Sequence, residues 1–299
     1  MFLASALCYA ADVGVVTVLD GSARVLRGVS WYKLAEGARL QDADVIDAAE
    51  HAQVQIELSP GPIATFVGAA EVFDAAAGSH EGKQPAPAEI YLTHGWLKFS
   101  VKQGGGSLRV RSPAGTLTTS DGVAVMHAEA ETLEAFVERG NVRLIEPSKA
   151  GGEGASHDLK GGDFAIRASD RPFASTGAVP QAFVAAMPRQ FRDALPSRAQ
   201  LYQVSHVQLV PDRAISYAEA EPWLVGPYRR LFLKRLQPRL TDPEFRALAS
   251  AKIPEWHSGP VPGENAPADK VEAPPKAPEK AEKAEKSESS WWPFGNSKK

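Results

Sequence analysis

The chain has 299 residues, of which 43% are hydrophobic and 23% charged, and its formal net charge is −3 at pH 7. These proportions are typical of a soluble globular protein, and the length allows one large domain or two ordinary ones. A nucleic-acid binder needs a basic surplus to neutralise phosphates, so the slight acidic excess argues against that class of partner. The sequence contains no internal run of about 18 apolar residues, so we expect no internal membrane-spanning helix.

Residues 1–11, MFLASALCYAA, resemble the apolar core and cleavage site of a secretory signal peptide. The run is short and no basic residue precedes it; a start codon assigned too far downstream would explain both features. The only cysteine, Cys8, lies here, but Leu7 stands where a lipid-attachment site has a small residue. A first buried element of a cytosolic protein is the alternative. We predict export to a bacterial periplasm with cleavage near Ala10, which leaves a mature chain that folds without disulfides.

Residues 13–170 are predicted to form short strands separated by turns, because alternating apolar runs recur without a helical period. The Asp-Gly dipeptide ending at Gly21 is a strong hairpin signal. A second hairpin is predicted through Gly140. Further turns are predicted at Gly95 and Gly122, each between two alternating runs.

The stretch GARLQDADVIDAAEHAQVQIEL illustrates the pattern. Gly37 is expected to supply a turn, and Asp44 to hydrogen-bond its own turn. Leu40 and Ile46 are expected to pack in the core. The run AQVQIEL alternates apolar and polar residues, as a half-buried strand does.

Residues 178–257 are predicted to form a small helical subdomain. Pro180 stands at a helix start, and Pro188 should end that helix. Thr241 or Asp242 is the expected N-cap of the last helix. Between them, EAEPWLVGPYRRLFLKRL places acids before bases, the order that a helix dipole favours. The run VSHVQLVPD is one further candidate strand.

Residues 258–299 are rich in Pro, Ala, Lys and Glu and carry no apolar face, so we predict a disordered spacer. The chain ends in WWPFGNSKK. Trp291 and Trp292 are candidate docking residues for a partner or a membrane surface, and a chance hydrophobic tip is the alternative.

The order of the β motifs resembles the periplasmic domain of FecR-type proteins. The matching pieces are GVVTVLDGSARVLRG, LAEGARLQDADVI, AQVQIELSPGPIATF, IYLTHGWLKFSV, LRVRSPAGTLTTSDGVAVMHA, AFVERGNVRLIEP and LKGGDFAI. Ser112 replaces the usual Thr, and Pro62 lies inside a glycine turn. The resemblance covers about half the chain. It implies a mainly β domain of stacked short strands, β-helix-like or sandwich-like. The helical subdomain and the tail predicted above lie outside the resemblance.

In that family the domain relays the state of an outer-membrane receptor to a cytoplasmic sigma factor through a membrane helix. The sequence shows neither a cytoplasmic N-terminal segment nor a spanning helix, so we do not expect that relay here. The resemblance then implies an exported, non-enzymatic binding, scaffolding or sensory module. Its expected partner is an envelope protein or polysaccharide, and the sequence identifies neither the ligand nor any role in iron signalling.

Sequence motifs for catalysis are missing: the chain has no nucleophile elbow, no phosphate-binding loop and no metal-binding histidine spacing. We therefore predict no catalytic residue, no metal and no cofactor. Paired carboxylates of a glycan hydrolase are the less favoured alternative. The candidates are Asp44 with Asp47, and Glu129 with Glu131 and Glu134, and a turn or solvent-facing position is expected for each.

Aromatic residues near the predicted turns are a second lead, because aromatic rings can stack on sugars. Trp31, Tyr32 and Trp96 are the candidates for a glycan- or cell-wall-binding protein, and core packing is the alternative. Basic residues form a candidate surface for an acidic partner, with a solvated helix end as the alternative. That stripe contains Arg229, Arg230, Lys234 and Arg235.

Overall fold

The computed structural model describes residues 12–59, 61–74, 87–148, 153–168, 171–204, 207–253 and 256. The predicted signal peptide with Cys8, and the predicted tail with Trp291 and Trp292, lie outside these residues. Among the described residues, no helix combines the length and the apolar character needed to cross a membrane.

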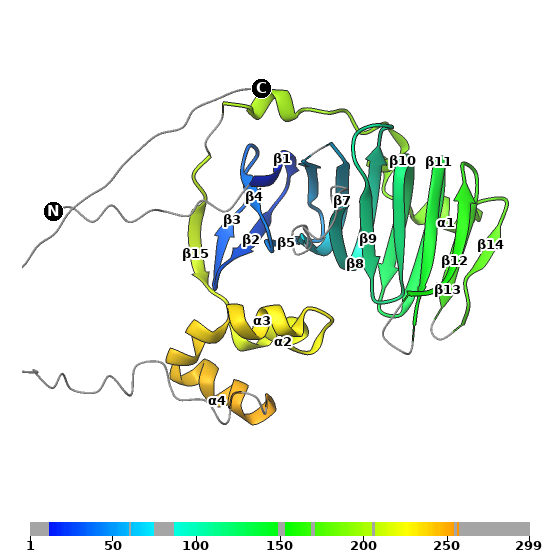
Figure 1. Ribbon diagram of the computed structural model, residues 1–299. Coiled ribbons are helices and arrows are strands. Elements are labelled where there is room, and N and C mark those ends of the chain that lie inside the picture. The colour runs from blue at the N-terminus through cyan, green and yellow to red at the C-terminus, as the bar shows by residue number, and fades with distance from the viewer. Residues whose placement is uncertain are drawn as a thin grey trace, which may run out of the picture. The chain divides into compact units, whose positions relative to one another are not determined.

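The fold is mainly β, as predicted (Figure 1). The strands are β1 Asp12–Asp20, β2 Ala23–Arg27, β3 Ser30–Lys33, β4 Arg39–Gln41, β5 Val45–Ala48, β6 Gln53–Leu58, β7 Ile63–Asp74, β8 Ala88–Val101, β9 Leu108–Ser112, β10 Gly115–Glu129, β11 Thr132–Pro147, β12 Glu153–Lys160, β13 Phe164–Ala168, β14 Ala174–Thr176 and β15 Val210–Ala214. The α-helices are α1 Gln181–Ala186, α2 Tyr217–Val225, α3 Arg229–Arg235 and α4 Pro243–Lys252, and 3-10 helices span Arg189–Arg192, Ala199–Tyr202 and Gln237–Thr241.

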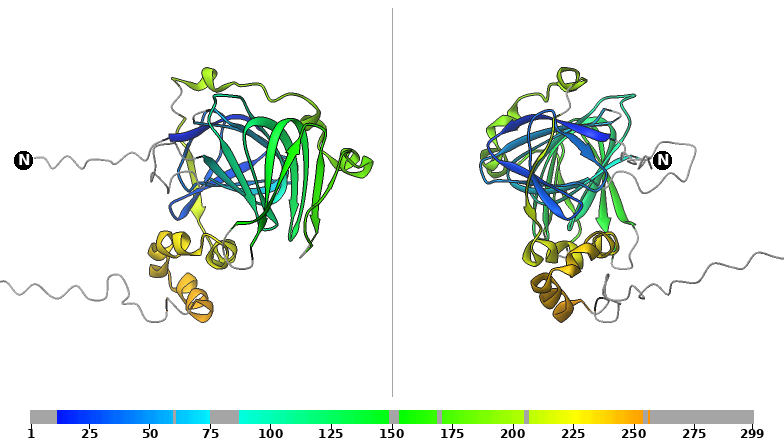
Figure 2. Two further views of the ribbon diagram at one scale, coloured as in Figure 1. Left: turned by 45° about the vertical axis from the view of Figure 1, so that its right-hand side comes forward. Right: turned by 90° about the vertical axis from the view of Figure 1, so that its left-hand side faces the viewer.

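The strands belong to one 15-stranded sheet that bends into two facing layers. Layer A contains β4, β1, β6, β13 and β14, and layer B contains β15, β3, β2, β5, β9 and β12. The long strands β7, β8, β10 and β11 contribute one half to each layer (Figures 1 and 2). The architecture is therefore sandwich-like, with four strands shared at the corners.

Glycines mark the corners at which long strands cross between layers. Gly68, Gly95 and Gly140 have φ values of 83°, 102° and 79°, in the region that only glycine adopts readily. The predicted hairpin through Gly140 is wrong, because β11 continues through this residue as one bent strand. The turns predicted at Gly95 and Gly122 also lie inside continuous bent strands, β8 and β10, and of these two glycines only Gly95 has a positive φ.

The hairpin predicted at Gly21 is also wrong, although the turn itself is present with φ 85°. Strand β1 pairs with β4 and β6, whereas β2 pairs with β3 and β5. The turn thus carries the chain from layer A to layer B. A local Asp-Gly signal fixes the reversal of the chain but not the strands that pair on either side of it.

The turn and the packing predicted from Gly37 onward are confirmed, but the half-buried strand is wrong. Gln55 and Glu57 on the polar face of β6 are only 2% and 7% exposed, because residues 188–203 cover them. Gly37 has φ 81°, and the carboxylate of Asp44 accepts a hydrogen bond from the Gln41 backbone N–H at 2.9 Å. Leu40 is fully buried. Asp44 is 1% exposed, and the guanidinium of Arg27 binds both of its oxygens at 3.1 and 2.6 Å. This carboxylate is therefore a structural group that holds a turn.

The strands bury apolar side chains on both faces, because each layer is covered on its outside as well. Val25 and Ile46 point into the core between the layers. Their neighbours Leu26 and Val45 point outward and pack beneath α2, α3 and α4. Figures 1 and 2 show these three helices gathered on one side of the strands.

The outer face of layer A is covered by a different segment. Helix α1 and the 3-10 helix after it place Phe183 and Phe191 against this layer. Pro180 precedes α1 and Pro188 follows it, as predicted. Residues 178–257 therefore do not form one helical subdomain, because α1 packs on layer A and the later helices on layer B.

Residues 188–203, here called the strap, continue across layer A as two short 3-10 helices, Arg189–Arg192 and Ala199–Tyr202, joined by irregular chain. The ammonium of Lys98, a side chain only 2% exposed, donates to the backbone oxygens of Phe191 at 2.6 Å and Asp193 at 2.8 Å. Gln55 donates to the Pro196 oxygen at 2.9 Å. Polar side chains of the sheet thus satisfy the strap's backbone, while Phe191 supplies an apolar anchor.

Arg235 fixes the helices to layer B. Its guanidinium donates to the backbone oxygens of Gly28 at 2.6 Å, Leu26 at 2.7 Å and Ala43. Burial lowers the pKa of Arg235 to about 10. This residue is therefore not part of a solvated basic stripe, because the helix that carries it turns its side chain toward the sheet.

The ends of the helices follow local rules. Asp242 is the N-cap of α4, one of the two residues predicted, and its carboxylate accepts from the backbone N–H of Glu244 at 3.0 Å and of Phe245 at 3.3 Å. At α2, Ser216 and Glu219 form a capping box. The carboxylate of Glu219 also accepts hydrogen bonds from the two terminal guanidinium nitrogens of Arg213, at 2.7 and 2.6 Å.

These contacts predict a pH-dependent contribution of Glu219 to stability. Hydrogen bonds from Arg213 lower the pKa of Glu219 well below its ordinary value of 4.5, although burial opposes them. The stabilisation is therefore complete above about pH 4.5 and is lost as the pH falls through the lowered pKa. We expect Glu219→Gln to reduce the free energy of unfolding by roughly 1–3 kcal/mol at pH 7, and by much less at pH 2.5.

Urea unfolding at both pH values measures this difference. Glu221→Gln is the control on the same helix, because the Glu221–Lys252 ion pair is exposed to solvent. Equal losses for Glu219→Gln at both pH values would contradict the role of the charged carboxylate.

Candidate functional site

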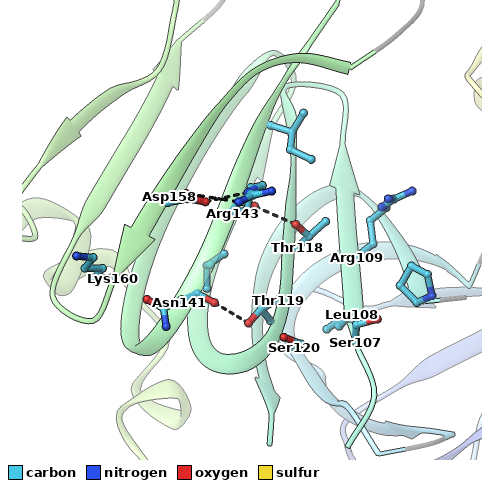
Figure 3. A pocket seen from close by; sticks show the side chains of 13 residues that line it. Ser107, Leu108, Arg109, Thr118, Thr119, Ser120, Asn141, Arg143, Asp158 and Lys160 are labelled. Atoms are coloured by element: carbon cyan, nitrogen blue, oxygen red, sulfur yellow. Dashed lines mark hydrogen bonds and ion pairs between the residues drawn. The ribbon is translucent and has the colours of Figure 1, made fainter. Parts of the chain in front are cut away.

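One part of the outer face of layer B is left open by the helices. It is a groove of about 680 Å³ over β9, β10, β11 and β12 (Figure 3). A second hollow of about 550 Å³ adjoins it and shares Arg109 and Ile145 with it. We call the two together the open face. Its lining includes Arg109, Arg111, Thr116, Thr118, Ser120, Asn141, Arg143, Ile145, Asp158 and Lys160.

Strand register places polar side chains of the open face in a row. Arg109 is opposite Thr118, Thr118 is opposite Arg143, and Arg143 is opposite Asp158. Residues paired in this way on neighbouring strands present their side chains to the same face. Figure 3 shows these four side chains along the floor of the groove.

A second row runs beside the first. Arg111 is opposite Thr116, which is opposite Ile145. Arg109 and Arg111 are two residues apart on β9, so their backbone positions are roughly 6.7 Å apart. Arg109 and Arg143 are two strands apart, a separation of about 9.6 Å. The open face thus carries three guanidinium groups on a regular lattice with threonines between them.

Glu89 marks the boundary between the open face and the helices. Its carboxylate lies 3.3 Å from Arg111 and 3.7 Å from Arg109, and it accepts a hydrogen bond from the Tyr228 hydroxyl at 3.0 Å. Burial, reinforced by Glu89, raises the pKa of the Tyr228 phenol. Burial lowers the pKa of Arg111, but Tyr228 and Glu89 together raise it more, so this guanidinium stays charged.

Arg143 is held more loosely. It pairs with Asp158 at 2.8 Å, but the two side chains are 58% and 69% exposed. An ion pair in water is screened and contributes little, so a ligand's acidic group can replace Asp158 at small cost. Asn141 and Lys160 extend the polar lining beyond this pair.

The charge of the open face differs in sign from that of the whole chain. Its acidic lining residues are two, Asp158 and Glu146. Its basic lining residues are four, Arg109, Arg111, Arg143 and Lys160. The carboxylate of Glu89, which contacts Arg109 and Arg111 at the border, leaves a local surplus of one positive charge. The chain as a whole carries −3. This surplus favours an anionic ligand over a neutral or cationic one.

The predicted aromatic platform is not assembled. Trp31 is 1% exposed and lies in the cluster beneath the helices, so a sugar cannot stack on it in this structure, and the ligand role is corrected to a core role. Tyr32 is half-buried against the core between the layers. Trp96 is stacked on His127, with ring centroids 4.3 Å apart, and touches Phe183.

The predicted basic surface is divided as well. The guanidinium of Arg229 is half-buried and donates to the Leu224 backbone oxygen at 2.5 Å, whereas Arg230 is exposed. With Arg235 turned inward, the residues do not form one basic stripe.

The carboxylates considered for hydrolysis are engaged elsewhere. Asp44 binds Arg27, and Asp47 binds Arg24 at 2.8 Å. Glu134 contacts His127 at 3.2 Å. Glu129 and Glu131 are exposed at the turn between β10 and β11. Across the described residues, no group of three or more His, Cys, Asp or Glu side chains could hold a metal ion.

Comparisons with known proteins identify no family for the chain. No family model matches it, and no curated protein matches it. Two crystal structures of a "putative anti-sigma factor" from Parabacteroides distasonis align with it, each at 14% identity and over 47% of this chain. The TM-scores are 0.38 and 0.37, and the alignments span 62% and 63% of those chains. Scores at this level leave both family and function open.

The residues of the open face were not selected from the sequence. Arg109 and Arg111 stand in the run LRVRS, and Thr116 and Thr118 in GTLTTS, where basic or hydroxyl residues alternate with apolar ones. Such alternation identifies a strand with one polar face. That these faces adjoin follows from the pairing of β9 with β10, which the sequence does not reveal.

Proposed function

We propose that this protein is an exported, non-enzymatic binding module of the bacterial envelope, built on a FecR-like β-domain. The open face is its binding surface. The observation that carries the proposal is the row of Arg109, Thr118 and Arg143 on a rigid sheet, at the place where the helices leave the sheet uncovered. Export rests on the apolar N-terminal sequence, and the FecR-like character on the order of the β motifs.

The absence of catalysis is part of the proposal. Each carboxylate pair that a hydrolase would need is bound to a basic partner or lies apart on an exposed turn. The open face presents guanidinium, hydroxyl and amide groups, which bind ligands by charge and hydrogen bonds. Such a surface suits a scaffold or sensor that recognises an extended anionic partner.

Cell fractionation followed by co-sedimentation tests this function. The full chain, expressed from its native start, should reach the periplasm. Its intact mass there should be that of a chain that begins near residue 11. The purified mature protein should sediment with isolated envelope fragments. Thr118→Trp, which places a bulky ring in the middle of the groove, should abolish that sedimentation while leaving the fold intact. A cytosolic full-length protein, or sedimentation that Thr118→Trp does not change, would refute the proposal.

A further inference from the structure

The open face differs in kind from the surface that holds the strap. On layer A, the strap is held by Phe191, which is fully buried, and by polar side chains that bond its backbone. A peptide is recognised in this way, through an apolar anchor and through satisfied backbone groups. The fold therefore contains its own example of a polypeptide segment held on a sheet surface.

The open face lacks such an anchor site among its described lining residues. Two apolar side chains that the register directs outward there, Ile145 and Tyr91, are each only 7% exposed, and Tyr91 packs with the helices. The other lining groups include guanidinium, hydroxyl and amide groups, the carboxylates of Asp158 and Glu146, and four prolines, Pro87, Pro113, Pro147 and Pro227. An acidic peptide would gain charge contacts here, but it would bury no large side chain.

A regularly repeating, hydroxylated polyanion fits these groups better. Arginine forks bind carboxylates with two parallel hydrogen bonds, and hydroxyl and amide side chains bond sugar hydroxyls. The guanidinium groups of Arg109 and Arg143 belong to one line across the strands, with Thr118 between them. A stiff polymer that crosses the strands would contact a guanidinium group, a hydroxyl group and a second guanidinium group in succession.

We infer that the open face binds an acidic polysaccharide whose sugars carry carboxylates, through Arg109, Thr118 and Arg143. The inference rests on the proposed function and assigns a ligand class to the same surface. Recognition depends on charge and hydroxyl groups and not on tryptophans, because Trp31 is buried in the core. Arg111, tied to Glu89 and Tyr228, gives the polymer a fixed cation at the border of the helices.

Titration with defined polymers tests the inference. The purified protein should bind polygalacturonate and alginate, both made of uronic acids, and should not bind neutral dextran. The affinity should fall steeply as salt is raised, because exposed charges are screened. Changing Arg109 and Arg143 together to Gln should weaken binding about a hundredfold or more, since each lost charged hydrogen bond is worth about tenfold or more in affinity.

Arg192→Gln is the matched control, because it removes an exposed arginine from the segment that packs on layer A. It should leave the affinity within about twofold. Both variants should keep the wild-type circular dichroism spectrum. Failure of either uronic acid polymer to bind overturns the inference, as does binding of poly-glutamate with equal or higher affinity. In either case, envelope sedimentation that still depends on Thr118 would preserve the proposed function with another anionic partner.

Discussion

Gly140→Ala should be among the most damaging single substitutions in this protein. Gly140 has φ 79° at a corner where β11 crosses between the layers. A Cβ atom there would lie 2.3 Å from the Asp121 backbone oxygen and 2.7 Å from the Gly122 Cα. Both are backbone atoms, which cannot rotate away as a side chain can. We expect a loss of about 2–5 kcal/mol in the free energy of unfolding, combining about 1–2 for the left-handed conformation with about 1–3 for the clash.

Comparison with Gly162→Ala separates the cost of the clash from the cost of the left-handed conformation. Gly162 also has positive φ, 99°, but a Cβ atom there meets nothing within 4 Å. It should cost only the conformational part, about 1–2 kcal/mol. Equilibrium unfolding in urea compares the two variants. Equal losses would mean that the corner in β11 is looser than the structure shows.

Trp31→Ala is the second substitution with a large expected effect. The ring is buried between β3 and the helices, and the Arg24 guanidinium lies 4.1 Å from its centroid. Removing a buried tryptophan leaves a cavity and costs about 3–5 kcal/mol. Urea unfolding should show this loss. The helices should also become more accessible to protease, because Trp31 is part of the surface on which they pack.

Trp31→Phe is the informative control. The indole Nε1–H of Trp31 has no acceptor among the described residues, so a phenyl ring removes a buried, unsatisfied donor. Phenylalanine should therefore retain most of the stability that alanine loses. The opposite pattern, normal stability with loss of polysaccharide binding in Trp31→Ala, would restore the ring as a ligand platform.

Local rules predicted local features well. The turn at Gly37, the hydrogen bond of Asp44 to that turn and the N-cap at Asp242 were all predicted, because each depends on residues close in sequence. The mainly β class also followed from alternation. The corners were misread, because a glycine that turns a chain between two layers carries the same local signal as one that closes a hairpin.

The candidate site could not be derived in this way. Arg109 and Arg143 are 34 positions apart in the sequence, and they meet only because β9 and β11 both pair with β10. Arg235, which was predicted to lie in a basic surface stripe, is half-buried against the sheet, where it donates hydrogen bonds to three backbone oxygens of layer B. Strand pairing and hydrogen bonds between residues distant in sequence belong to the tertiary structure. The pattern of a single sequence does not predict them.

Site-specific photo-crosslinking in intact cells tests the central claim, binding through the open face, most directly. A diazirine amino acid would replace Ser120, an exposed residue in the groove, or Gln200, an exposed residue of the strap on the other layer. Irradiation should give a heavy adduct at Ser120 and none at Gln200. An adduct at Gln200 alone, or equal labelling at both positions, would contradict the assignment of the open face as the binding surface.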